Sequence, residues 1–108
     1  QMCIRDSSQL EAEREALSRE HTQELENQLA DYERLNRAVH RNQDSLLPLA
    51  KEKVELSMAS YRAGKGDLNA VVAARRELIE ARLKQIEVEE QRALTSARLY
   101  FAYGEPSQ

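Results

Sequence analysis

Hydrophobic residues along the first half of the chain recur at spacings of three and four, which is the period of an α-helix. The residues that form this apolar stripe are Leu25, Leu29, Tyr32, Val39, Leu46, Ala50, Val54 and Tyr61. Most residues between them are charged or polar, so the pattern predicts one long amphipathic helix. The stripe drifts by one position between Ala50 and Val54 and is therefore not a strict heptad. This drift favours a helix that packs against more than one neighbour.

Glycine and proline divide the chain into two helical stretches. Glycine is absent before Gly64, and neither glycine nor proline occurs between Asp67 and Tyr103. The spacing predicts a first helix over residues 8–63, a turn over 64–67, a second helix over 68–103 and a tail over 104–108. Gly64 suits the left-handed residue that ends a helix, and Asp67 suits the N-cap of the next one. The predicted fold is therefore an all-α, long antiparallel two-helix coiled-coil hairpin.

Pro48 interrupts the first predicted helix. Proline removes one backbone donor, and its ring crowds the carbonyl four residues earlier, here that of Asp44. The apolar stripe resumes nearby in phase, so we expect a bend near Pro48 rather than the end of the helix.

The second predicted helix carries two adjacent apolar strips. One strip consists of Leu68, Val71, Leu78 and, less regularly, Gln85 and Glu89. The other consists of Val72, Ile79, Leu83, Ile86, Leu94, Ala97 and Phe101. Two strips imply two neighbours, and a hairpin supplies only one of them. We expect another chain or a further segment to cover the second strip.

The two predicted helices differ in length. A fold at Lys65 brings Tyr103 near Glu26, so residues 10–26 have no partner within the hairpin. This segment is rich in glutamate, and an isolated helix of this length is marginally stable in water. We therefore expect the chain to be a fragment of a larger helical assembly.

Composition narrows the possible functions. The chain of 108 residues is 32% charged and 5% aromatic, and it contains no Trp. A net charge of −3 does not suggest a nucleic-acid or anionic-membrane surface, and no run of about 18 apolar residues could cross a bilayer as a helix. Cys3 is the single cysteine and receives no role. The carboxylates lie on polar faces without a pocket, so we expect no enzyme activity and no cofactor.

The first seven residues stand apart. Residues 2–7 read Met-Cys-Ile-Arg-Asp-Ser, which resembles translated sequencing-adapter DNA at the edge of an assembled fragment. We expect residues 1–7 to be a foreign or disordered N-terminus.

Residues 46–105 resemble the last periplasmic hairpin of the TolC-like outer-membrane efflux proteins. The matching pieces are Leu47-Pro48, Tyr61-Arg62-Ala63-Gly64, Lys65-Gly66-Asp67-Leu68 and Ala74-Arg75-Arg76. The Tyr-x-x-Gly tip, with proline upstream and Ala-Arg downstream, is the most specific part of this resemblance. The Arg-Arg pair and the alanine-rich second helix are similar to those of the heavy-metal efflux branch.

The resemblance implies a homotrimer with a β-barrel in the outer membrane and an α-helical barrel in the periplasm. The hairpin would form part of this passive exit duct. Its tip would dock a periplasmic adaptor and, through the adaptor, an inner-membrane pump. The tip residues implied are Tyr61, Arg62, Gly64, Lys65, Gly66, Asp67 and Leu68. Many relatives carry an acidic pore gate early in the second helix, and this chain instead has Val71-Val72-Ala73-Ala74.

Two alternatives stay open. The chain could be the α-hairpin of the adaptor itself, or a purely structural coiled coil, which predicts a stricter heptad and no reason for Pro48. A metal site at His21 and His40 is disfavoured, because the two lie 19 residues apart without the ligand spacing of known sites. Tyr61 fits equally an adaptor contact and an aromatic that closes the last layer of the hairpin.

Overall fold

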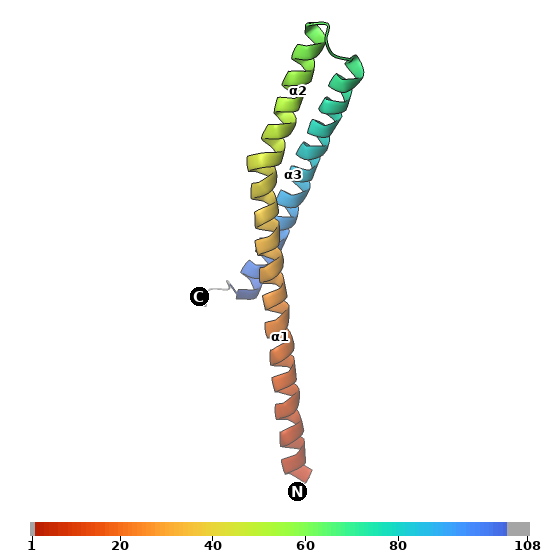
Figure 1. The fold of residues 1–108 in the computed structure, drawn as a ribbon. Helices are drawn as coiled ribbons and strands as arrows, with labels where there is room; N and C mark the ends of the chain where they lie inside the picture. The colour runs from red at the N-terminus through yellow and green to blue at the C-terminus, as the bar shows by residue number, and fades with distance from the viewer. Residues whose placement is uncertain (1, 104–108) are drawn as a thin grey trace.

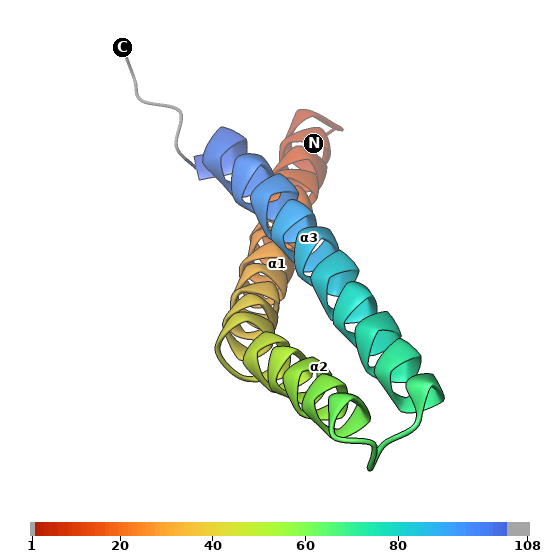
Figure 2. The same cartoon turned by 90° about the horizontal axis from the view of Figure 1, so that it is seen from above.

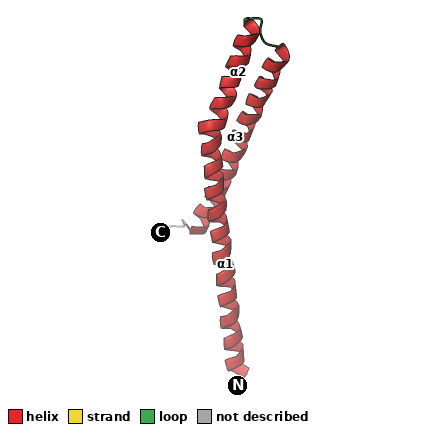
Figure 3. Ribbon diagram, in the orientation of Figure 1, coloured by secondary structure: helices red, strands yellow, loops and turns green. Residues whose placement is uncertain are grey.

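The computed structural model describes residues 2–103, and these residues form an antiparallel helical hairpin (Figure 1). Helix α1 spans Met2–Arg41, a short π-helix η1 spans Asn42–Leu46, and α2 spans Leu47–Arg62. After a turn, α3 spans Leu68–Tyr103 and runs back along the first arm. Every described residue outside the turn of residues 63–67 is helical, and the described part of the chain contains no strand (Figure 3). The prediction of an all-α hairpin is confirmed.

The hairpin is elongated. Its extents are 91 × 30 × 15 Å and its radius of gyration is 25.0 Å. A compact domain of about 100 residues would have a radius of gyration of about 13 Å. The molecule therefore has no central core, and its apolar contacts form a single seam between two helical arms.

The seam on α3 follows a strict heptad. Among residues 68–102 the side chains that are buried or half-buried are Val71, Ala74, Leu78, Ala81, Gln85, Val88, Arg92, Thr95 and Leu99. Their spacing alternates between three and four without interruption, which is the a/d pattern of a coiled coil. Coiled-coil packing thus extends along nearly the whole of α3.

The opposite arm follows the same pattern in two blocks. Up to the first residue of the π-helix the seam consists of Leu25, Gln28, Tyr32, Leu35, Val39 and Asn42, and after the π-helix it consists of Leu47, Ala50, Val54 and Ser57. Asn36, Ala38, Met58 and Ser60 are half-buried beside it. Val39 is the most deeply buried residue, with 1% of its surface exposed. From Asn42 to Leu47 the step is five residues instead of four. One extra residue is therefore inserted into the heptad at this point.

The π-helix absorbs this extra residue. The backbone N–H of Leu47 donates to the carbonyl of Asn42, five residues earlier, which is the hydrogen bond of a π-turn. Pro48 follows directly as the second residue of α2, and because proline has no N–H it donates no hydrogen bond back to the preceding turn. Figure 2 shows that the helix changes direction between α1 and α2. The predicted bend is present, and it lies at Asn42–Leu46, just before Pro48.

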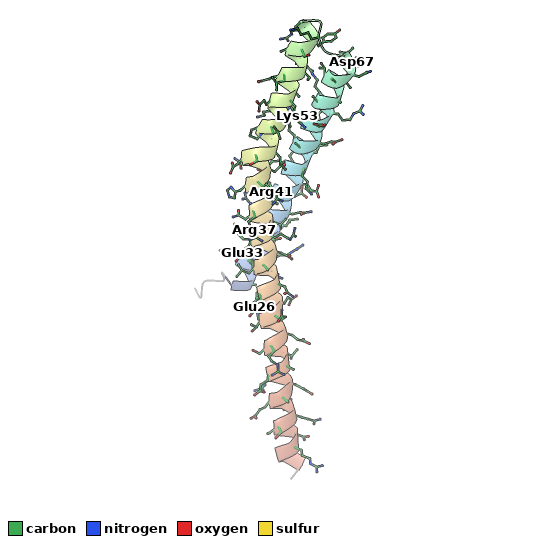
Figure 4. All side chains as sticks on the ribbon, in the orientation of Figure 1. Glu26, Glu33, Arg37, Arg41, Lys53 and Asp67 are labelled. Carbon is green, nitrogen blue, oxygen red and sulfur yellow. The ribbon has the colours of Figure 1, made fainter. Side chains whose placement is uncertain are left out.

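The arms are unequal in length. Every side chain from residue 5 to residue 24 is exposed, and α1 extends well beyond the end of α3 (Figure 1). Figure 4 labels Glu26 on α1 just past the level at which α3 ends. The unpartnered segment expected from the sequence is therefore present in this chain.

Three details differ from the sequence-based expectations. Residues 2–7 belong to α1, which begins at Met2 rather than at residue 8, because the segment contains neither glycine nor proline. The first arm ends at Arg62, and the turn includes Ala63. The predicted tail, residues 104–108, lies outside the described residues.

The predicted stripes also need correction. Leu29, Leu46 and Tyr61 are exposed, whereas Leu35 lies in the seam. On α3, Leu68 and Glu89 are exposed, and the seam passes through Val88 and Thr95 instead. The reason is that the seam follows the 3.5-residue period of two coiled helices rather than the 3.6-residue period of a straight one.

Candidate functional site

The turn at the tip is a Schellman motif that ends α2. The N–H of Lys65 donates to the carbonyl of Ser60 at 2.9 Å, and the N–H of Gly64 donates to the carbonyl of Tyr61 at 3.0 Å. This pair of bonds defines the motif and satisfies carbonyls that the helix leaves free. Gly64 has φ of 72°, the left-handed conformation predicted for it.

Gly66 is required for a different reason. A Cβ at this position would lie 2.6 Å from the Oγ of Ser60 and 3.2 Å from its backbone carbon. Gly64 has open space around it, so only its φ demands glycine there. The two glycines of the tip therefore serve distinct purposes.

Asp67 caps the second arm. Its Oδ1 accepts a hydrogen bond from the N–H of Asn69 at 3.2 Å, and its carbonyl accepts one from the N–H of Ala70 at 3.0 Å. Its carboxylate also lies at the positive end of the α3 dipole. Figure 4 labels Asp67 at the tip, where the second arm begins. The predicted N-cap is confirmed.

The structure brings the predicted tip residues together, and it places them on the surface. Tyr61 and Leu68 are both about half exposed, and they line one shallow groove with Met58, Arg62, Val72 and Arg75. The Nη2 of Arg75 lies 3.4 Å from the Sδ of Met58 across this groove. Lys65 is exposed at the end of the turn. The tip thus combines an apolar floor with a polar rim.

The two ends of the hairpin carry opposite charge. Residues 58–76 contain four cationic side chains, Arg62, Lys65, Arg75 and Arg76, and one carboxylate, that of Asp67. Residues 8–26 contain six glutamates and two arginines. The cationic tip and the acidic far end are tens of ångströms apart along the long axis of 91 Å. At that distance, salt screens each charge cluster from the other.

Two exposed apolar strips lie on opposite sides of the seam. The α2 strip consists of Leu46, Leu49 and Leu56, each one residue before a seam position. The α3 strip consists of Val72, Ile79, Leu83 and Ile86, while two further exposed residues, Leu94 and Phe101, lie toward the other side of the seam, Leu94 directly before the seam position Thr95. Val72, Ile79 and Ile86 each follow a seam position by one residue. Because the helices are antiparallel, these offsets place the two strips on opposite faces of the hairpin.

The grooves on the two faces agree with this geometry. Leu46 and Leu49 line one groove together with Lys53, Glu77 and Lys84. Val72 lines the tip groove on the other side, together with Met58 and Arg75. The second strip predicted on α3 is therefore exposed from Val72 to Ile86, whereas its last members, Leu94 and Phe101, line a groove with His21, Glu24 and Leu25 of α1.

A buried polar layer crosses the seam beside the π-helix. The Nδ2 of Asn42 donates to the Oε1 of Gln85 at 2.8 Å and to the carbonyl of Ala81 at 3.2 Å. The Nε2 of Gln85 in turn donates to the Oε1 of Glu89 at 2.6 Å. Both Asn42 and Gln85 are buried. Asn42 was not among the residues predicted from the sequence, although its position three residues after Val39 places it in phase with the seam.

No other chemistry stands out in the described part of the chain. His21 and His40 are exposed, and the described side chains include no group of three His, Cys, Asp or Glu that could hold a metal ion. None of the described helices combines the length and the apolar character that a membrane crossing requires.

Comparison with protein-family models, with curated proteins and with solved structures found no match for this chain.

Proposed function

We propose that this chain is a wall segment of a multi-copy helical tube, namely the periplasmic α-barrel of a TolC-like export channel in the outer membrane. The observation that carries the proposal is the pair of apolar strips on opposite faces of the hairpin. A contact in which one copy's α2 strip meets the next copy's α3 strip is heterologous. Repeated contacts of this kind close into a ring when the rotation allows it.

The shape of the hairpin supports the same proposal. Its extents of 91 × 30 × 15 Å are those of an elongated segment that packs beside others in a wall, rather than those of a compact domain. Residues 5–24 of α1 are exposed in the described chain. In the wall, neighbouring hairpins would cover them. Burial of about 25 cal/mol per Å² of apolar surface would favour such packing. In a trimer, each copy would supply part of the duct.

The tip is proposed as the docking surface for a periplasmic adaptor that belongs to an inner-membrane pump. Tyr61 and Leu68 supply exposed apolar surface, while Arg62 and Lys65 supply charge. A partner surface with acidic residues around an apolar centre would complement this arrangement.

A purely structural coiled coil is the second candidate, and the uninterrupted heptad of α3 favours it. Such a coiled coil needs one seam, and it leaves the strip from Val72 to Ile86 without a partner. The two proposals therefore differ in whether copies of the chain associate side by side.

A mixing experiment tests lateral association. One variant carries Leu49→Glu and Leu56→Glu, and the other carries Ile79→Glu and Ile86→Glu. A heterologous contact predicts that the parent associates, that each variant alone is limited to much smaller species, and that an equimolar mixture forms a one-to-one dimer. Sedimentation velocity measures all three. Gln91→Glu serves as the control for added charge, because it places one carboxylate at an exposed α3 position outside both strips.

A parent that stays monomeric at high concentration would contradict the wall proposal and favour the structural coiled coil. Variants that behave alike and do not recombine would indicate a symmetric contact instead.

Gly64→Val in the full-length protein tests the docking tip. Valine in the left-handed region costs about 1–2 kcal/mol and distorts the turn. We expect export to be lost while the assembled protein stays in the membrane. Ala63→Val is the matched control, because Ala63 has φ of −81° and can accept a β-branched residue. Unchanged resistance to the exported compounds in the Gly64 variant would argue against docking through this turn.

A further inference from the structure

The extra residue in the first arm gives α2 a choice between two inward faces. The structure places Leu47, Ala50, Val54 and Ser57 against α3, and this requires the π-helix at Asn42–Leu46. Counting from Asn42 by the heptad steps of an uninterrupted α-helix selects different residues. These are Leu46, Leu49, Lys53, Leu56, Ser60 and Ala63.

Three of these alternative positions carry leucine, and they are the same three residues that form the exposed α2 strip. The present inward face holds one leucine, one valine and one alanine, with Ser57 as its fourth member. The α2 sequence therefore encodes two apolar strips that differ in phase by one residue. The conformation of the five residues Asn42–Leu46 decides which strip faces α3.

We propose that η1 is a register switch. Conversion of the π-helix to α-helix turns α2 by about 100° about its axis and advances it by about 1.5 Å toward the tip, the increments of one helical residue. This rotation brings the exposed α2 strip against α3 and moves the buried strip out of the seam. In the alternative state Leu46, Leu49 and Leu56 face α3, and Leu47, Ala50 and Val54 become exposed on the face of the hairpin that carries Met58 and Val72.

Two residues hold the switch in the observed state. In an uninterrupted α-helix, the ring of Pro48 would crowd the carbonyl of Asp44. This clash lowers the population of that state relative to the observed one by on the order of a hundredfold. Lys53 would also enter the seam, where a buried ammonium is unfavourable. In the observed state Lys53 stays exposed, and its Nζ lies 3.5 Å from the Oε2 of Glu77 (Figure 4).

The segments on either side of α2 allow a local rotation. Asn42 is anchored to α3 through Gln85 and Ala81, so the part of the seam before the π-helix keeps its register. At the other end, the turn of residues 63–67 contains Gly64 and Gly66 and absorbs the change. The rotation is thus confined to α2.

Thiol labelling of single cysteines tests the switch in the whole 108-residue chain with Cys3→Ser as background. Leu49→Cys and Ala50→Cys are neighbouring reporters, because Leu49 is 51% exposed and Ala50 is 8% exposed. In this background we expect position 49 to react faster by on the order of tenfold or more, since a buried thiol reacts only after local opening. In a variant that carries Pro48→Ala and Lys53→Leu, we expect the order of the two rates to invert.

Deletion of Asp44 provides the matched control. It removes the extra residue, so an uninterrupted α-helix again directs Ala50 inward. Added to the Pro48→Ala, Lys53→Leu variant, the deletion should restore faster labelling at position 49.

Three results would overturn the proposal. The first is an unchanged order of rates in the double variant, and the second is an inverted order that persists after the deletion. The third is a double variant with less helical circular dichroism than the background, because the alternative seam of leucines should be at least as stable. None of these readouts depends on assembly into a tube.

Discussion

The buried layer formed by Asn42 and Gln85 makes a quantitative prediction about hairpin stability. Asn42→Ala removes the hydrogen bonds to the Oε1 of Gln85 and to the carbonyl of Ala81. The carbonyl of Ala81 still accepts a backbone hydrogen bond within α3, but the Oε1 of Gln85 is left buried without a hydrogen-bond donor. An unsatisfied buried acceptor costs about 1–3 kcal/mol. We therefore expect Asn42→Ala to lower the free energy of unfolding by about 2 kcal/mol.

Replacement of both partners should behave differently. In the variant Asn42→Leu with Gln85→Leu, no buried polar atom of the layer loses its partner, and two leucines of similar volume fill the seam. Such exchanges are close to neutral or stabilising. The double variant should thus unfold at a urea concentration equal to or above that of the parent. Its seam would also lose the polar layer that favours one register.

Urea unfolding followed by helical circular dichroism measures these differences, at two or more chain concentrations so that association is separated from folding. Asn36→Ala is a useful comparison, because the Oδ1 of Asn36 accepts a hydrogen bond from Arg92 at 2.8 Å in a less buried setting. A cost below about 0.5 kcal/mol for Asn42→Ala would refute the reasoning. So would a leucine double variant that is less stable than Asn42→Ala.

Two further predictions concern single residues. Asp67→Ala should lower the melting temperature, since loss of the bond to the N–H of Asn69 costs about 1 kcal/mol. Asp67→Ser should retain most of that stability, and equal melting of the two variants would contradict the N-cap role. Gln28→Leu should raise the free energy of unfolding by about 1 kcal/mol, because the Oε1 of Gln28 is buried and lacks a hydrogen-bond partner within the described chain. Gln23→Leu at an exposed site is the control, and a similar gain there would argue against this explanation.

The hairpin and its turn were predictable from local chemistry. Gly64 and Asp67 determine where one helix ends and the next begins, through a positive φ and a side-chain cap that depend on few other residues. The second strip on α3 was also predictable, because large apolar residues at helical spacing can be recognised without knowing which helix packs against them. These features are properties of single helices or single turns.

The seam was harder to predict because it depends on how two helices coil around each other. Leu29 fits the period of a straight helix and yet is exposed, whereas Leu35 fits the heptad and is buried. Asn42 and Gln85 escaped notice as partners because each is polar and they lie 43 residues apart. A search for strict alternation of three and four in both arms would have found the pair.

The one-residue insertion links the inside of the hairpin to its outside. Without it, Leu46, Leu49 and Leu56 would face α3, and the face of α2 that now exposes them would lose its leucines. With it, a seam that includes Ala50 and Ser57 suffices to join the arms, while three leucines remain on the surface. An exposed apolar strip promotes aggregation of a chain that remains monomeric in water. Pro48 and Lys53 nevertheless favour the state that exposes it, which is the arrangement expected of a helix that packs on two sides.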